Sequence, residues 1–179
     1  MDRRKVTMIG INLLGGAAVL GSYAHGLLTH PETGPQLWGA VPEGLRPLYT
    51  VSMLLATAGY FPLTAYLLLR VDPDRASVAG RFGFGLFNWL YALITFPSAL
   101  WMPLTLAMLE NPGAGLWFLI RVDLAIVGLA SLGMVSSLLA LNQRRPRLHY
   151  ALAIAGAVFL ANQTVLLDAI VWPVFFPGG

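Results

Sequence analysis

Five long apolar runs, separated by short charged or Pro/Gly-rich turns, constrain the fold of this chain more than any other feature. They occupy residues 6–28, 48–69, 82–108, 115–141 and 149–172. A helix of about 20 apolar residues, rising about 1.5 Å per residue, is long enough to cross a bilayer. Only 11% of the 179 residues are charged, whereas soluble domains carry about 25%. We therefore predict an all-α, polytopic integral membrane protein, with residues 1–179 forming a single domain and a five-transmembrane-helix bundle.

The basic residues are distributed unevenly between the turns. Nine of them flank the spans on the side of the N-terminus, Arg46 alone falls on the other side, and Arg121 lies inside a span. Loops rich in Lys and Arg stay in the cytoplasm. We therefore expect a cytoplasmic N-terminus, an outside C-terminus and a long extracytoplasmic loop over residues 29–46. The expected location is a bacterial inner (cytoplasmic) membrane.

The composition excludes several kinds of site. The chain has no cysteine, which excludes disulfides, thiolate metal sites, cysteine nucleophiles and covalent c-type haem. The only lysine, Lys5, lies outside the spans, so a retinal Schiff base is excluded as well. His25 and His30 are five residues apart across a proline boundary, which is poor spacing for a metal, and nucleic-acid-binding patterns are absent. The sequence indicates no particular cofactor, no metal site and no catalytic motif.

Charged residues lie inside the last two spans, on either side of a basic turn centred near residue 145. Position 122, between Arg121 and Asp123, and Asp168 are each 23 residues from that centre. In two antiparallel helices, residues equally far from the connecting turn lie at the same depth in the membrane. We therefore expect these charges to meet within its outer half. A lone charge there costs about 2.5–3.5 kcal/mol even on insertion scales. We predict an intramembrane ion pair between Arg121 and Asp168.

The arrangement of these charges leaves three interpretations open. Arg121 and Asp123 are two residues apart, about 200° around a helix, so they cannot face the same point. A buried pair can serve only to fix helix register, it can bind a ligand or a proton, or the arginine can reach back to the headgroups.

A ligand pocket is expected in the outer half, beneath the 29–46 loop. Pro97 and Pro103 are expected to bend or break the outer half of the third span, exposing carbonyls to a protein-lined or wet cavity. Simpler roles are also open: an interfacial anchor for Trp38, a hydrated side chain for His25, and interhelical hydrogen bonds for the mid-membrane amides. The candidate ligand-binding residues are Arg121, Asp123, Asp168, His25, Trp38, Tyr49, Asn88, Trp101, Asn162 and Gln163.

Three short segments resemble a known family. Trp38 to Pro42, followed by Pro47 to Tyr49 and Met53, is similar to the passage from the first loop into the second helix of the translocator protein/tryptophan-rich sensory protein (TspO/MBR) family. Leu86 to Trp89 resembles its third-helix Asn/Trp motif, and Arg147 to Tyr150 resembles the start of its last helix. The paired prolines after the loop tryptophan and the short turn between helices three and four are absent.

That resemblance carries its own expectations. It implies a five-helix fold with a pocket for a porphyrin, a sterol or a similar amphipathic molecule, closed by the first loop. Trp38 and Asn88 are the contacts that it implies.

We weigh three functions. The first is binding, transport or sensing of a small amphipathic or lipid-like ligand in the outer half. The second is an accessory or assembly subunit of a larger membrane complex, or a homo-oligomer, docking through small-residue pairs such as Ala17/Gly21 and Ser22/Gly26. A flat Gly/Ala face on the first or last span with no enclosed pocket would favour it. The third is a membrane enzyme using His25 with Asp123 or Asp168 as acid and base, which requires hydrogen-bond contact between them.

Overall fold

The computed structural model describes residues 1–176, which form five helices long and apolar enough to cross a membrane, as predicted. No strand forms within the described residues; the 70–84 turn contributes only isolated bridges from Val78 to Phe82 and Leu141. The helical elements are α1 (Arg3–Thr29), α2 (Arg46–Leu69), α3 (Gly85–Glu110), α4 (Ala114–Leu139), α5 (Arg147–Ala161), the π-helix η4 (Asn162–Val171) and α6 (Trp172–Phe175). The last three elements together make the fifth span.

The helices begin where the sequence provides local signals. The side chain of Asp2 accepts a hydrogen bond from the Arg4 backbone N–H and caps α1. Pro47 lies in the first turn of α2, where its missing N–H costs nothing. Pro146 immediately precedes α5, and Gly113 precedes α4 in an extended conformation. Each of the five predicted helices is confirmed, with ends that differ by only a few residues.

The third span differs from the prediction of a broken outer half. Helix α3 runs without interruption from Gly85 to Glu110 and contains both Pro97 and Pro103. Each proline removes a single backbone donor, and Ser/Thr hydroxyls can bond to helix carbonyls nearby. Here the Ser98 hydroxyl donates to the Ile94 carbonyl at 2.6 Å. Of the predicted bend or break, the break is therefore wrong, because α3 continues past both prolines.

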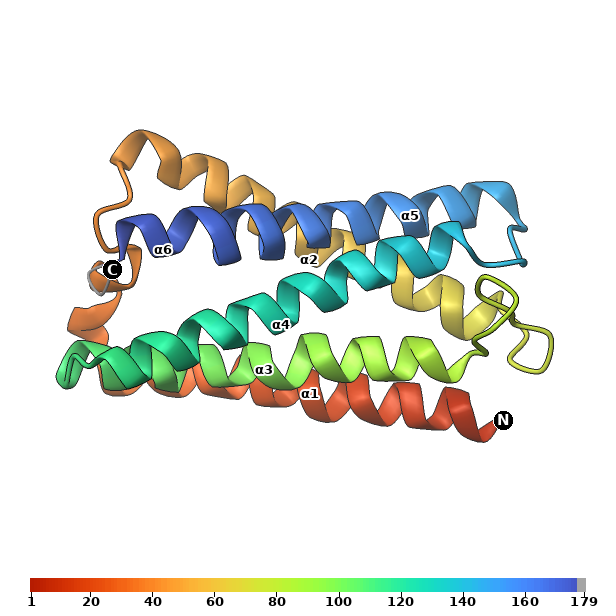
Figure 1. The fold of residues 1–179 in the computed structure, drawn as a ribbon, viewed down its shortest axis with the longest axis horizontal. Coiled ribbons are helices and arrows are strands. Elements are labelled where there is room, and N and C mark those ends of the chain that lie inside the picture. The colour runs from red at the N-terminus through yellow and green to blue at the C-terminus, as the bar shows by residue number, and fades with distance from the viewer. Residues whose placement is uncertain (177–179) are drawn as a thin grey trace.

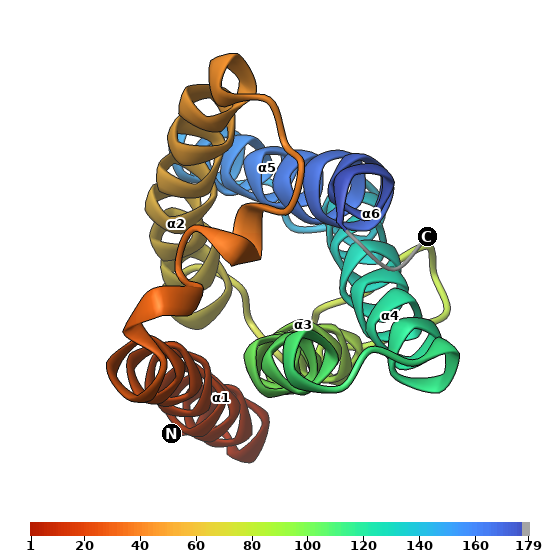
Figure 2. The same ribbon diagram turned by 90° about the vertical axis from the view of Figure 1, so that its left-hand side faces the viewer.

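The order of helices around the bundle differs from their order in the chain. Helix α1 packs on α3, α3 on α4, α4 on α5 and η4, and α2 on α5. Figure 2 shows α2 and α1 on one side of the bundle with little contact between them. Helix α2 therefore finds its main partner in the last span, about a hundred residues later in the sequence.

Glycines allow neighbouring helices to approach closely, as two contacts show. A Cβ added to Gly59 of α2 would lie 2.5 Å from the Cα of Gly156 on α5, so the two backbones touch. A Cβ on Gly26 of α1 would lie 2.7 Å from the Met102 side chain of α3. Gly26 belongs to a predicted small-residue pair, and its close approach to a neighbouring helix is confirmed.

The two ends of the bundle are formed by different segments of the chain (Figure 1). The N-terminus and the turns 70–84 and 140–146 share one end, which we call the basic end. The 30–45 segment, the turn at 111–113 and the end of α6 lie at the other, which we call the loop end. The 30–45 segment contains three short 3-10 turns.

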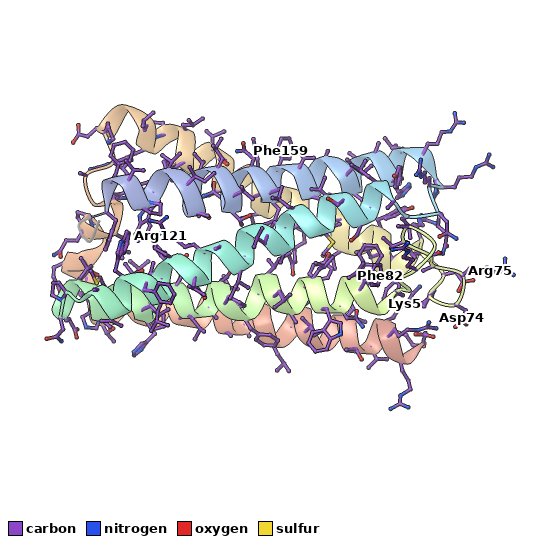
Figure 3. All side chains as sticks on the ribbon, viewed as in Figure 1. Lys5, Asp74, Arg75, Phe82, Arg121 and Phe159 are labelled. Atoms are coloured by element: carbon purple, nitrogen blue, oxygen red, sulfur yellow. The ribbon has the colours of Figure 1, made fainter. Side chains whose placement is uncertain are left out.

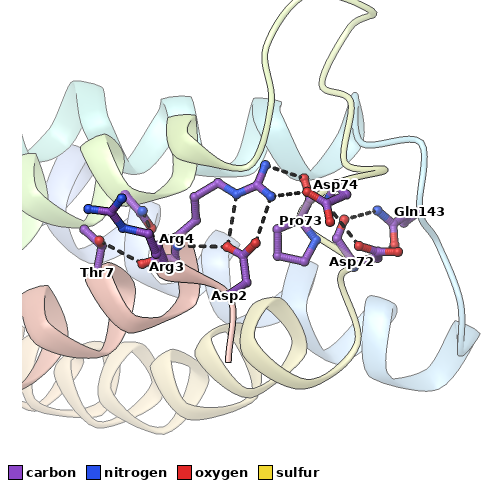
Figure 4. A network of polar contacts seen from close by, with 9 residues as sticks. Asp2, Arg3, Arg4, Thr7, Asp72, Pro73, Asp74 and Gln143 are labelled. Atoms are coloured by element: carbon purple, nitrogen blue, oxygen red, sulfur yellow. Dashed lines mark hydrogen bonds and ion pairs between the residues drawn. The ribbon is translucent and has the colours of Figure 1, made fainter.

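A polar network ties the turns of the basic end to the start of α1 (Figure 4). Arg4 pairs with Asp2 and with Asp74, and also donates to the Pro73 carbonyl at 3.0 Å. The Gln143 side chain donates to the Asp72 carbonyl at 2.9 Å and thereby joins the two turns. Hydrogen bonds from Arg4 hold the pKa of the Asp2 carboxyl down at about 2.

Candidate functional site

The π-helix η4 brings together two polar side chains that an α-helix would separate. Gln163 and Asp168 are five residues apart, which in an α-helix of 3.6 residues per turn places them roughly 140° apart. A π-helix closes its bonds between residues five apart, so such residues stack on one face. The Gln163 amide donates to a carboxylate oxygen of Asp168 at 2.7 Å. Wide turns of this kind occur frequently at functional sites.

Asp123 on α4 lies level with Asp168. Gly128 packs against η4, since a Cβ built on it would lie 3.4 Å from the Thr164 carbonyl oxygen. From that contact, Asp123 lies five residues toward the loop end along α4, and Asp168 lies four residues toward it along η4. The predicted equal depth of Asp123 and Asp168 is therefore borne out.

Two acceptor atoms in this group are buried without a donor. Asp123 is only 6% exposed and Gln163 only 7%. The Oδ2 of Asp123 and the Oε1 of Gln163 have no hydrogen-bond partner among residues 1–176. An unsatisfied buried acceptor costs about 1–3 kcal/mol. We call Asp123, Gln163 and Asp168 the acceptor group.

An aromatic cluster gathers at the same end of the bundle. Trp172 stacks on Phe176 with ring centroids 4.3 Å apart and meets Trp101 edge-on at 5.5 Å. Trp117 stacks on Phe176 at 5.9 Å, and Tyr23 stacks on Trp101 at 5.6 Å. We call these five residues the aromatic cluster.

The long loop is fastened over this region by hydrogen bonds to the last span. The indole N–H of Trp172 donates to the Leu37 carbonyl at 2.9 Å, and the Ala40 N–H donates to the Phe175 carbonyl at 2.7 Å. Trp38 meets the ring of Tyr49 edge-on at 5.8 Å. The buried Tyr49 hydroxyl donates to the Leu167 carbonyl at 3.1 Å. Trp38 and Tyr49 therefore connect the loop to η4 beside Asp168.

Arg121 does not form the predicted ion pair. Its side chain is exposed, and its guanidinium carbon lies 5.8 Å from the centroid of the Trp117 ring. Within residues 1–176 it makes no ion pair with Asp168 or Asp123. The two-residue spacing explains the outcome: when Asp123 faces the interior, Arg121 is turned about 200° away. Figure 3 places Arg121 on the loop-end half of α4, far from Lys5 and Arg75.

The other residues predicted to bind a ligand lie in different parts of the bundle. His25 is exposed, and its side chain makes no hydrogen bond or ion pair in the described part of the chain. Asn162 donates to the Ser52 hydroxyl at 3.1 Å, an interhelical bond between η4 and α2. Asn88 donates to the Arg4 carbonyl at 3.0 Å, near the basic end. The acid–base hypothesis that needs His25 beside a carboxylate therefore has no geometric support.

The hollows of the structure lie away from the loop. One, of about 340 Å³, opens at Asn142 to Arg145 on the basic end. Another, of about 320 Å³, is a shallow apolar groove between α4 and the fifth span, lined by residues that include Leu132, Val158 and Asn162. Neither of these two hollows lies beneath the loop, where the sequence predicted a pocket. No group of three His, Cys, Asp or Glu residues converges to hold a metal within residues 1–176.

The sequence analysis missed Tyr23, Trp117, Trp172 and Phe176. The topology offered a signal, because Trp101, Trp117 and Trp172 all fall in the same half of their spans once five crossings are assigned. Aromatic residues alone were too common in the spans to single these out.

No protein-family model, curated protein or solved structure matches this chain. The resemblance to the translocator protein/tryptophan-rich sensory protein family therefore stays a prediction. Its two implied contacts do not meet: Trp38 lies at the loop end, whereas Asn88 lies at the start of α3 near the basic end. Asn88 and Trp101 are thirteen residues apart, about 20 Å along the helix axis.

Proposed function

We propose that this is an integral membrane protein that binds a small amphipathic molecule in its outer half, between the acceptor group and the aromatic cluster. The N-terminus and the basic end face the cytoplasm of a bacterial cell, so the loop end faces outward. Nine basic residues flanking the spans on the N-terminal side support this orientation.

One observation carries the proposal. Asp123 is almost fully buried in an apolar bundle, yet one of its carboxylate oxygens has no donor within residues 1–176. Ionisable residues inside a membrane are expensive and usually mark a substrate or ion site. The aromatic cluster at the same end supplies a large apolar surface. The region therefore offers a polar group and an apolar surface, which match the two parts of an amphipathic ligand.

The proposal can be tested by intrinsic fluorescence, because Trp101, Trp117 and Trp172 are three of the five tryptophans. Purified protein would be titrated with a porphyrin, a sterol, a phospholipid and alkyl amphipaths of either charge, and its extractable molecules identified by mass spectrometry. We expect at least one saturable response, weakened about tenfold or more in Asp123→Asn. Trp172→Phe should lose the signal, while Trp89→Phe, at a position 72% exposed near the basic end, should keep it. An absence of any saturable response and of any extracted molecule would refute the proposal.

A second function, an accessory subunit of a membrane complex, is favoured by a specific feature of α1. A Cβ added at Gly10, Gly16 or Gly21 would meet nothing within 4 Å, and Ala17 is exposed beside them. Small residues on a lipid-facing surface let another helix approach closely. Purification in mild detergent should then yield a stoichiometric partner that Gly21→Leu removes. Leu20→Ala, an exposed neighbour on the same helix, serves as the control.

A further inference from the structure

We propose that Arg70 and His149, where the end of α2 meets the start of α5, bind the headgroup of an anionic phospholipid. This site lies in the basic-end half, away from the acceptor group and the aromatic cluster, so it is separate from the amphipath site proposed above. It rests only on the proposed insertion of the chain in a membrane, which brings the basic end to one leaflet of phospholipid.

The basic end carries a surplus of positive charge that its own carboxylates do not balance. Nine Lys and Arg residues flank the spans there, and the carboxylates at this end are those of Asp2, Asp72 and Asp74. Arg4 pairs with Asp2 and Asp74, and Arg75 pairs with Asp72, so two arginines engage all three carboxylates. The other seven basic residues make no ion pair within residues 1–176: Arg3, Lys5, Arg70, Arg81, Arg144, Arg145 and Arg147.

Two basic side chains of this end converge from different helices. A terminal guanidinium nitrogen of Arg70, directly after α2, lies 3.5 Å from the Nε2 of His149, in the first turn of α5. This separation is at the long limit of a hydrogen bond, so the contact itself is weak. Both side chains are exposed. A guanidinium N–H and an imidazole N–H can each donate to an oxygen of one phosphate, so the pair is placed to bind a phosphate from two sides.

Contacts between the same two helices hold this pair in place. Tyr66 lies one helical turn before Arg70, and Tyr150 directly follows His149. The rings of Tyr66 and Tyr150 lie 5.8 Å apart, and the Tyr66 hydroxyl donates to the Gln143 carbonyl at 2.7 Å. The two helix ends that carry the cations are therefore joined next to them, so the pair does not depend on flexible side chains alone.

Apolar side chains beside the pair favour a lipid over a soluble phosphate. Leu69 precedes Arg70 and is 73% exposed, and Leu148 precedes His149 and is 68% exposed. Leu152, three residues after His149 and on the same side of α5, is exposed as well. A phospholipid whose phosphate lies on the pair can place its acyl chains against these leucines, whereas a free phosphate leaves them uncovered.

The neighbouring charges favour a lipid with a net negative charge. Arg147 lies two residues before His149, and Arg144 and Arg145 line the hollow of about 340 Å³ on the turn before α5. Phosphatidylcholine brings its own quaternary ammonium to a region that is already positive, whereas phosphatidylglycerol or cardiolipin brings none. Basic clusters at the cytoplasmic ends of membrane helices bind anionic headgroups of this kind.

Native mass spectrometry of the unaltered chain in detergent tests the preference. The protein would be incubated with equal concentrations of phosphatidylglycerol and phosphatidylcholine that carry the same acyl chains, and the bound lipids would be counted. We expect phosphatidylglycerol to bind about fivefold more tightly or better. sn-Glycerol 3-phosphate, which has the phosphate without the chains, should not displace it at equal concentration.

Variants locate the preference. Arg70→Gln and His149→Ala should each reduce it to about twofold or less. Arg81→Gln is the matched control for Arg70→Gln, because it removes one positive charge from the same end and Arg81 also makes no ion pair within residues 1–176. It should retain most of the preference. All three side chains are exposed, so each variant should melt at the temperature of the unaltered chain.

The possible failures are distinguishable. Equal binding of the two phospholipids to the unaltered chain would overturn the proposal. A loss in Arg81→Gln as large as that in Arg70→Gln would show that overall charge, and not this pair, sets the preference. Displacement by sn-glycerol 3-phosphate at equal concentration would overturn the assignment to a lipid. None of these outcomes affects the amphipath site at the loop end, whose fluorescence signal comes from Trp172.

Discussion

The basic-end half and the loop-end half of the bundle differ in how many buried polar atoms they leave without a hydrogen bond. In the basic-end half, Tyr60 donates to Asn12 at 2.5 Å, Thr64 and Tyr91 bond at 2.8 Å, and Tyr66 donates to the Gln143 carbonyl at 2.7 Å. In the loop-end half, Asp123 and Gln163 each keep a buried acceptor without a donor among the described residues. Asn88 is the exception at the basic end, with one bonded and one unbonded polar atom.

This difference separates polar groups that hold helices together from polar groups that do not. Hydrogen bonds between buried polar side chains hold neighbouring helices together. The direct backbone contact of Gly59 with Gly156 also holds two helices together. Buried acceptors that are left over do not hold helices together, because they lower stability. The basic-end half therefore satisfies most of its buried polar groups, whereas the loop-end half leaves the acceptors of Asp123 and Gln163 without a donor among the described residues.

The largest effect should come from breaking the cohesive contact. Gly59→Ala places a Cβ against the Gly156 backbone, which cannot move aside as a flexible side chain can. We expect a loss of about 3 kcal/mol, the upper end of the usual cost of overpacking. Denaturant unfolding in mixed micelles would measure it.

Gly10→Ala is the matched control, because a Cβ there meets nothing within 4 Å. It should leave stability unchanged or raise it slightly. A Gly59→Ala protein as stable as the unaltered chain would show that α2 and α5 are not in backbone contact.

The next largest effect is an increase in stability, expected when a carboxyl of the loop-end half is replaced. Asp123→Leu replaces a buried carboxyl that has no donor at its Oδ2 within residues 1–176 by an apolar side chain of similar size, so we expect a gain of about 1–3 kcal/mol in stability. Asp123→Asn, which keeps a polar group in place, should gain less. The same unfolding measurement applies, and a marked loss in Asp123→Leu would mean that this carboxyl is satisfied and structural.

A smaller loss is expected from a single interhelical hydrogen bond. Tyr60→Phe leaves the Asn12 carbonyl oxygen without its donor and should cost about 0.6–1.7 kcal/mol, the range found for such bonds in membranes. Tyr23→Phe is the comparison in the other half, because the Tyr23 hydroxyl makes no hydrogen bond within residues 1–176. Equal losses in the two variants would contradict the division between the halves.

The smallest effect concerns pH at the basic end. Arg4 lowers the pKa of Asp2 from 3.8 to about 2, so the ionised carboxylate is favoured in the folded protein. Its contribution to stability is complete above pH 4 and is lost as the pH falls through about 2. The difference in melting temperature between the unaltered chain and Asp2→Asn should shrink over that interval. A constant difference would show that the Arg4 contact does not depend on the charge of Asp2.

The sequence predicted how far along the bundle the charged residues of the last two spans lie. It did not predict which way each side chain points around its helix. Counting residues from the basic turn placed Asp123 and Asp168 at one level, and the structure agrees. The same count said nothing about which of Arg121 and Asp123 faces inward. The wide turns of η4 also change the angle per residue, so the bond between Gln163 and Asp168 could not follow from a period of 3.6.

The arrangement at the loop end was only partly predictable for another reason. Long loops have no periodicity that fixes their path, so the contacts of Leu37 and Ala40 with the last span had no sequence signal. The topology did predict that the loop would cover the half containing Tyr49 and Trp101. The aromatic cluster that occupies this space follows from side-chain packing, which composition alone does not determine.

The pairing of α2 with α5 has a consequence for synthesis. A ribosome releases residues 46–69 long before residues 147–161 exist, so the second helix must wait for its neighbour. A nascent chain stopped before residue 147 lacks the surface that α2 packs against, and Ser52 and Gly59 then have no partner on the last span.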